Sequence, residues 1–172
     1  NHYMDESSVL TWNVNGLLDC IKRGAVLRGV KRYNPSVAFL QETHLLSTRC
    51  PMLGRYGYDR VLHAGFVRGA RGVAILFKRS FPFTIVCSIS DPGGRFVATW
   101  GLLEGKAYNF VVFTFPPQLH ALTFQDLNRI LLDLPQGVLI IGGDWNAMLD
   151  RNINFSRGWK CGLYRPMHSL GP

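Results

Sequence analysis

The chain has 172 residues, 47% of them hydrophobic and 17% charged, and its 19 Lys and Arg against 11 Asp and Glu give a formal net charge of +8. This length fits one domain, the apolar content excludes wholesale disorder, and no apolar run approaches the about 18 residues that a transmembrane helix needs. The positive charge favours an anionic partner, which is nucleic acid, an acidic membrane surface or a phosphorylated molecule, unless it serves only solubility.

The first third of the chain predicts a strand, a helix and a second strand. Residues 8–14 alternate along the chain and are rich in β-formers, which is typical of a strand. From Leu18 to Tyr33, apolar side chains recur at helical spacing with basic residues between them. Asn34 and Pro35 end this helix, and the apolar run 36–41 then predicts a buried strand.

The following segments predict several strands joined by turns. They are 58–63, 72–77, 83–89, 95–103 and 107–115. Glu104–Lys106 predicts a hairpin turn between the last two. A second amphipathic helix is expected over 119–134, followed by a fully apolar strand over 138–142. Because most of these strands are joined by turns, we expect mixed, largely antiparallel sheets with the helices outside.

The periodic pattern ends after Asp150, and no acidic residue follows it. We therefore divide the chain into an N-terminal extension (1–7), a folded domain (8–150) and a basic, irregular tail (151–172). Because the chain begins with Asn1 rather than Met, we expect it to belong to a longer reading frame.

Four cysteines occur, and no pair of them has the spacing of zinc ligands. Cys20 and Cys87 lie in apolar segments, so we expect both in the core. All four thiols are expected to be reduced, as is usual inside cells.

Three polar clusters stand where apolar strands end, around Asn13, Glu42 and Asp144. Such ends come together in stacked sheets, and carboxylates there suit Mg²⁺, while a second carboxylate can orient or deprotonate an attacking water. Each residue also has an ordinary structural interpretation. Asn13 can cap a turn, Glu42 can be a solvated strand end, and Asp144 can belong to a simple turn.

Four strings occur in order along the chain: Leu10–Leu17, Gln41–Leu45, Gly72–Phe77 and Gly143–Asn146. Together they resemble the endonuclease domain of LINE-type (non-LTR) retrotransposons. That domain belongs to the endonuclease/exonuclease/phosphatase superfamily, which includes the apurinic endonucleases. The resemblance covers about residues 8–150. It implies an α/β fold, a four-layer α/β/β/α sandwich of two mixed sheets with outer helices.

The resemblance also implies an activity, a cofactor and a partner. The activity is Mg²⁺-dependent hydrolysis of a DNA phosphodiester, with Mn²⁺ as an alternative metal, and the resulting nick primes reverse transcription. DNA is the expected partner, with no membrane and no small-molecule cofactor. The chain is then expected inside the cell, in the nucleus when it acts on DNA. The sequence leaves the oligomeric state open.

The resemblance assigns roles to four residues at the strand ends. Glu42 matches the metal-binding glutamate, and Asn13 matches the asparagine beside the metal and the scissile phosphate. Asp144 matches the aspartate that positions or activates the attacking water. Asn146 matches the amide that orients this aspartate and contacts phosphate.

DNA contacts are expected from three basic or polar side chains near these ends. Arg68 and Arg71 belong to a glycine-rich loop and are suited to hold the DNA backbone. His44 follows Glu42 by two residues and is assigned to the same contact.

The sequence departs from the family pattern in two places. Phe115 stands where we align the family's tyrosine, and loss of that hydroxyl is expected to cost on the order of 10² in rate. The family's final Ser-Asp-His string is absent. His168 is the only histidine after Asp144, and it has no neighbouring aspartate. We therefore expect a C-terminally truncated domain that lacks closing strands of its second sheet and is less stable than a complete one.

Two other functions remain open from the sequence. The first is a catalytically dead remnant that at most binds nucleic acid through its basic surface. The second is another metal-dependent member of the superfamily, such as a phosphoinositide or sphingolipid phosphodiesterase. The Gln41–Leu45 string and the charge of +8 disfavour the second alternative.

Overall fold

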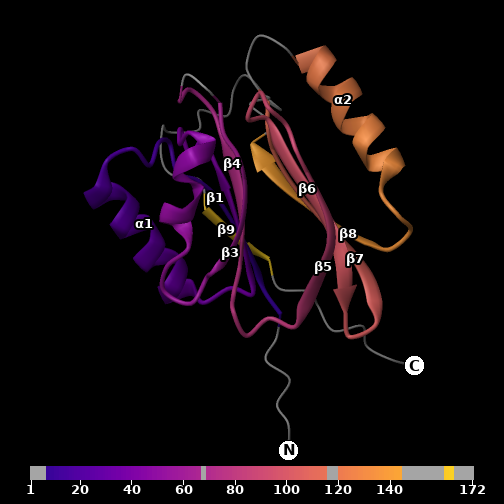
Figure 1. Ribbon diagram of the computed structural model, residues 1–172, viewed down its shortest axis with the longest axis horizontal. Helices are drawn as coiled ribbons and strands as arrows, with labels where there is room; N and C mark the ends of the chain where they lie inside the picture. The colour runs from indigo at the N-terminus through magenta and orange to yellow at the C-terminus, as the bar shows by residue number, and fades with distance from the viewer. Residues whose placement is uncertain (1–6, 67–68, 116–119, 145–160, 165–172) are drawn as a thin grey trace, which may run out of the picture.

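The computed structural model describes residues 7–66, 69–115, 120–144 and 161–164, and these form two sheets that lie face to face (Figure 1). The first sheet has the strand order β3-β4-β2-β1-β9 and the second the order β5-β6-β7-β8. In the first sheet the strands are β1 (Val9–Asn13), β2 (Val37–Gln41), β3 (Arg60–Ala64), β4 (Val73–Phe77) and β9 (Cys161–Tyr164). In the second they are β5 (Phe83–Ser90), β6 (Phe96–Leu103), β7 (Lys106–Thr114) and β8 (Val138–Asp144).

Helices cover the outer faces of both sheets. The α-helix α1 (Cys20–Tyr33) and the 3₁₀ helix η1 (Ser47–Leu53) lie outside the first sheet, and α2 (His120–Asp133) lies outside the second (Figure 1). Two neighbouring strand pairs, β1–β2 and β7–β8, are parallel, while the other pairs are antiparallel. The predicted four-layer sandwich of mixed, largely antiparallel sheets is confirmed.

Three apolar clusters fill the spaces between the four layers. One lies between the first sheet and its helices and includes Leu10, Val26 and Val30. The second lies between the two sheets and joins residues such as Phe39 of β2 to Phe110 of β7. The third lies under α2 and contains the side chains Phe96, Ala98, Val111, Phe113, Phe115 and Leu127. Burial of these side chains is the main source of stability for such a sandwich.

Helix α1 begins and ends where its sequence provides caps. The Asp19 side chain accepts a hydrogen bond from the Lys22 amide at 2.7 Å, which satisfies a free N–H at the helix start. Asn34 has a left-handed backbone, with φ of 52°, and its N–H donates to the Val30 carbonyl. Since the left-handed region suits asparagine better than most residues, Asn34 ends the helix at this point.

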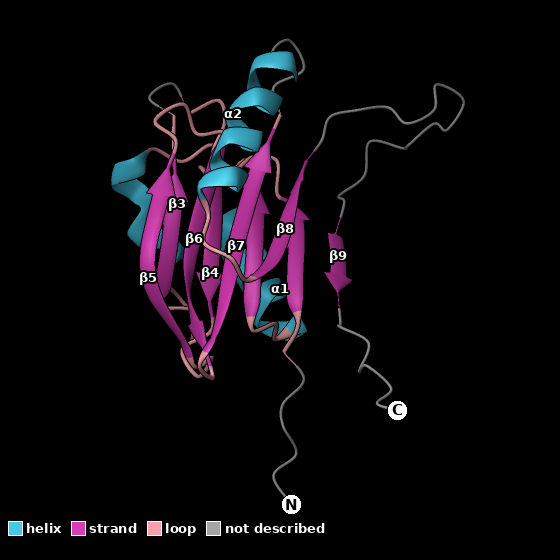
Figure 2. Cartoon of the chain, turned by 90° about the vertical axis from the view of Figure 1, so that its right-hand side faces the viewer, coloured by secondary structure: helices cyan, strands magenta, loops and turns pink. Residues whose placement is uncertain are grey.

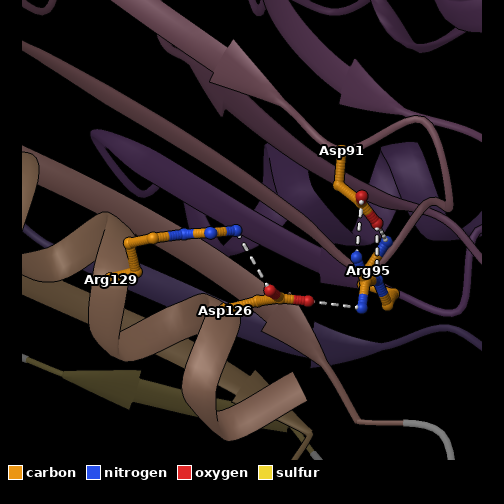
Figure 3. A network of polar contacts seen from close by, with 4 residues as sticks. All are labelled: Asp91, Arg95, Asp126 and Arg129. Atoms are coloured by element: carbon orange, nitrogen blue, oxygen red, sulfur yellow. Dashed lines mark hydrogen bonds and ion pairs between the residues drawn. The ribbon is translucent and has the colours of Figure 1, made fainter. Parts of the chain in front are cut away.

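A network of ion pairs fastens α2 to the turn between β5 and β6 (Figure 3). Arg95 forms hydrogen bonds with both Asp91 oxygens, from Nε at 2.8 Å and from a terminal nitrogen at 3.1 Å. Its other terminal nitrogen donates to Asp126 of α2 at 2.9 Å, and Asp126 also accepts from Arg129. Asp91 is 8% exposed and Arg95 23%, so this pairing is screened less by water than a surface ion pair.

The structure differs from the sequence predictions in three places. Strand β9 lies within residues 151–172, which were predicted to be irregular, and it extends the first sheet at its β1 edge (Figure 2). Cys20 and Cys87 are exposed rather than buried. Cys20 is the first residue of α1, and the buried residues of this helix begin only at Arg23. Cys87 lies on the outer face of β5, which α2 leaves uncovered because it packs on β6 and β7.

Neither described α-helix is long and apolar enough to span a membrane.

Candidate active site

The C-terminal ends of the two parallel strand pairs meet at one end of the sandwich. In the first sheet Asn13 of β1 lies beside Gln41 of β2, and in the second Thr114 of β7 lies beside Asp144 of β8. Strand β8 packs across the inner face of β1 and β2. The polar residues that follow or end these strands therefore face one another across the gap between the sheets.

Hydrogen bonds continue the pairing of β1 and β2 into the loops that follow them. The Gly16 N–H donates to the Glu42 carbonyl at 2.6 Å, and the Leu17 N–H donates to the Thr43 carbonyl at 2.8 Å. Glu42 and His44 both have left-handed backbones, with φ of 56° and 55°. Such conformations are costly for non-glycine residues and are concentrated at functional sites, where the surrounding structure holds them.

Asn13 and Asp144 form a direct hydrogen bond between the two sheets. Asn13 Nδ2 donates to Asp144 Oδ2 at 2.6 Å, although the residues are 131 positions apart. The Asn13 Oδ1 atom accepts from the Asn15 N–H at 3.1 Å, which fixes which way the amide faces. Asn13 thus holds the Asp144 carboxylate from the other sheet, and the role that the family resemblance assigns to Asn146 stays a prediction.

Both oxygens of the Glu42 carboxylate are held by neighbouring side chains. The Thr114 hydroxyl donates to Oε1 at 2.7 Å, and His44 Nε2 donates to Oε2 at 2.9 Å. Burial raises the pKa of Glu42, but the hydrogen bonds from His44 and Thr114, with the charges of His44 and Arg71, outweigh it and lower the pKa below its ordinary value. Glu42 therefore presents a negative charge in a half-enclosed setting, which suits a cation ligand.

A second histidine supports the loop that carries Glu42. Thr43 Oγ1 and His63 Nε2 of β3 lie 3.0 Å apart in a hydrogen bond, and Thr43 is fully buried. Burial lowers the pKa of His63 to about 4, so its ring is neutral at pH 7. Gly72 has a φ of 132° and lies directly against the Thr43 hydroxyl, where any side chain would collide with it.

Of the three predicted DNA-contacting residues, the structure places Arg71 and His44 near Glu42. The Arg71 guanidinium lies over the Phe66 ring, 5.2 Å from the centroid, and its charge contributes to the low pKa of Glu42. His44 is engaged with Glu42, and its contact with DNA stays a prediction. Arg68 and Asn146 lie outside the described residues.

Phe115 does not face this site, in contrast to the position expected for the family's tyrosine. Its ring is fully buried in the cluster under α2, 4.7 Å from that of Phe113. Side chains alternate along a strand, so Thr114 faces the opposite way and reaches Glu42. Sequence analysis missed Thr114 as a site residue. In β7, Val111 and Phe113 lie under α2 while Phe110 and Val112 lie between the sheets, so Thr114 continues the face that looks toward the other sheet.

The donor set fits a hard divalent cation. Glu42 and Asp144 supply carboxylates and Asn13 an amide oxygen, which are the ligand types that Mg²⁺ takes together with water. Each carboxylate oxygen of Glu42 accepts one side-chain hydrogen bond and keeps a further lone pair for a metal. Within the described residues, no group of three His, Cys, Asp or Glu side chains is arranged to hold a metal by itself. The arrangement therefore suits Mg²⁺ held by few protein ligands, rather than a closed structural site.

The sequence profile of the Endonuclease/Exonuclease/phosphatase family matches residues 10–159. The chain belongs to this family. An uncharacterised 149 kDa protein of transposon TX1 from Xenopus laevis is 29% identical over 153 residues, which cover 85% of this chain and 12% of that protein. This similarity agrees with the resemblance to retrotransposon endonucleases seen in the sequence.

Two solved structures show the same fold. The endonuclease domain of TRAS1, a telomere-specific non-LTR retrotransposon, superimposes with a TM-score of 0.61 at 18% identity, over 83% of this chain and 60% of that domain. TDP2 from D. rerio, in complex with a single-stranded DNA product, superimposes with a TM-score of 0.63 at 19% identity, over 83% of this chain and 61% of TDP2. The chain thus spans about three fifths of these two structures.

Proposed function

We propose that this chain is a metal-dependent DNA endonuclease domain that hydrolyses a phosphodiester and leaves a nick. The proposal depends chiefly on one observation: Asn13 is hydrogen-bonded to Asp144 across the sheets, and Glu42 is hydrogen-bonded to Thr114, which lies beside Asp144. The similarity to TX1 and TRAS1, both named as transposon proteins, supports a retrotransposon context. The basic charge of the chain supports an anionic polymer as substrate.

The residues divide the work of hydrolysis between them. Glu42 and the Asn13 amide oxygen would hold Mg²⁺ (or Mn²⁺), which when bound neutralises phosphate charge and polarises the phosphoryl group. Asp144, oriented by the Asn13 amide, accepts a proton from the attacking water or directs its lone pair toward phosphorus. Arg71, with His44 and Arg68, is proposed to hold the DNA backbone.

A plasmid-nicking assay with Mg²⁺ tests this proposal. Glu42→Gln and Asp144→Asn each remove one carboxylate charge at nearly constant size, so we expect each to lower the nicking rate by at least about 100-fold. Glu104→Gln and Asp133→Asn are the matched controls, because both residues are exposed and lie outside the site, on the β6–β7 turn and at the end of α2. Both controls should nick at the rate of the parent chain.

Two other results would give different conclusions. If the parent chain binds DNA in a salt-dependent way but does not nick it, the chain is the catalytically dead, nucleic-acid-binding form and the proposal is wrong. If the parent chain nicks and the Glu42 and Asp144 variants nick equally well, the activity belongs to a different site.

A further inference from the structure

Thr114 links the two sheets at the candidate site, and the proposed chemistry gives it no role. It is the last residue of β7 and is 1% exposed. Its hydroxyl crosses from the second sheet to the first and donates to Glu42 Oε1 at 2.7 Å. A buried hydroxyl that gives its hydrogen bond to a carboxylate is a strong, directional contact, because the acceptor is charged.

The backbone of Thr114 is fixed on both sides. Its N–H donates to the Arg95 carbonyl at 2.8 Å, and on the other side it lies in register with Asp144 of β8. Arg95 is in turn held by Asp91 and by Asp126 of α2 (Figure 3). The hydroxyl is therefore delivered from a rigid strand position, and not from a loop.

Glu42, by contrast, lies on a loop with a left-handed backbone. Its carboxylate is held at Oε2 by His44, which belongs to the same loop, and at Oε1 by Thr114, which belongs to the other sheet. The hydrogen bond from Thr114 connects Glu42 to the strand pair β7–β8, which carries Asp144. When the groups that orient a metal-binding carboxylate are removed, the affinity of the site for its metal typically falls 10- to 100-fold.

We propose that Thr114 is a positioning residue, which fixes the Glu42 carboxylate relative to Asp144 and so sets the spacing between the metal-binding and water-activating groups. The inference rests on the proposed function, since it assumes that Glu42 binds the metal. The Thr114 hydroxyl lies at the β7 end of the site, one residue before the buried Phe115. Thr114 touches neither water nor substrate in this role and acts only through Glu42.

The test compares Thr114→Val with Thr114→Ser by titration with Mn²⁺ alone, with free Mn²⁺ measured by electron paramagnetic resonance. Valine keeps the shape of threonine without the hydroxyl, so we expect about tenfold weaker Mn²⁺ binding or more. Serine retains the hydroxyl and should restore most of the affinity. Thr99→Val is the matched control, because Thr99 is also fully buried in the second sheet and donates to the Cys87 carbonyl, away from the site. It should bind Mn²⁺ like the parent chain.

Thermal unfolding of each variant shows that it is folded. If Thr114→Val does not fold, Thr114→Ala removes the same hydroxyl and takes its place in the comparison. Equal Mn²⁺ affinity in the parent chain and the hydroxyl-free variant overturns the inference, and so does a failure of Thr114→Ser to recover binding.

The Glu42→Gln variant separates this inference from the proposed function. If the parent chain binds Mn²⁺ and Glu42→Gln does not, the metal site stands, and a normal affinity in Thr114→Val refutes the positioning role alone. If the parent chain binds no Mn²⁺ and does not nick DNA, both proposals are wrong. Nicking measured over a range of Mn²⁺ concentrations adds a second comparison. In Thr114→Val a higher metal concentration should recover much of the rate, which a general loss of folded protein would not allow.

Discussion

The stability of this domain should depend on pH through His63, which the fold keeps neutral. Burial lowers the pKa of His63 to about 4, while an unfolded chain has a histidine pKa near 6.5. Between these values the unfolded chain binds a proton that the folded chain excludes. The contribution of His63 is therefore complete above pH 6.5 and is lost progressively as the pH falls toward 4.

The size of this effect follows from the difference between the two pKa values. Each unit of pH in this window is worth about 1.4 kcal/mol, so lowering the pH from 7 to 5 should remove about 2 kcal/mol of unfolding free energy. The hydrogen bond with Thr43 matters less than burial for this pH dependence, because burial is the cause of the low pKa of His63. The ring nitrogen Nδ1 of His63 has no hydrogen-bond partner among the described residues, which agrees with a dry environment.

Urea unfolding at pH 7 and pH 5, followed by tryptophan fluorescence, measures this difference. His63→Gln cannot bind the proton, so its loss between the two pH values should be smaller than that of the parent chain by about 2 kcal/mol. Thr43→Val is the control: it removes the hydrogen bond to His63 but keeps the titrating ring, and so it should lower stability at both pH values while the slope remains. Equal slopes in the parent chain and His63→Gln would refute the assignment of a buried neutral histidine.

Two further predictions concern helix α1 and the ion pairs of Figure 3. Gly24→Ala should raise the unfolding free energy by up to about 1 kcal/mol, because alanine favours helix and the new methyl meets only the flexible end of the Arg28 side chain. Gly29→Ala in the same helix should lower the unfolding free energy by about 1 kcal/mol or more, because its methyl would lie 2.9 Å from the Trp12 ring. Urea unfolding of both variants checks these opposite signs. In the network of Figure 3, Arg95→Met should lower the unfolding free energy by about 2–4 kcal/mol, because it leaves the buried Asp91 carboxylate without its ion-pair partner. Asp126→Asn lies on the more exposed side of the network and should lower it by less than about 1 kcal/mol. Shifts of the urea midpoint measure both effects.

Local patterns were sufficient to predict most of the secondary structure. Strand β1, the apolar strand β2 and helix α1 follow from alternation, continuous burial and helical spacing, and the structure places them within two residues of the predicted bounds. Strand β9 could not be predicted in the same way. It has only four residues, and it exists as a strand because Val9–Trp12 of β1 offers it an edge for pairing. Short strands of this kind depend on long-range contacts, which a local pattern does not contain.

The same limit applies to the candidate site. Asn13, Glu42 and Asp144 were recognisable because each stands where an apolar strand ends, and the hydrogen bonds of Asn13 and Glu42 bring all three to one end of the sandwich. Phe115 was aligned with the family's tyrosine, but its ring lies under α2, and Thr114 is the residue that reaches Glu42. Both faces of β7 are buried from Asn109 to Thr114, so hydrophobicity alone does not show which residues face the other sheet.

The meeting of Asn13 and Asp144 depends on how closely the sheets approach one another beside the site. Gly142 lies two residues before Asp144, and a methyl group there would be 2.6 Å from the Phe39 ring and 3.5 Å from Thr11 Oγ1. The absence of a side chain at Gly142 is therefore what lets β8 lie directly against β1 and β2. Since Asn13 and Asp144 each lie two residues beyond this contact on their own strands, the close packing at Gly142 sets the 2.6 Å hydrogen bond between them. The geometry of the candidate site is thus a consequence of packing between the sheets, and a substitution at Gly142 would separate Asn13 from Asp144 without touching either.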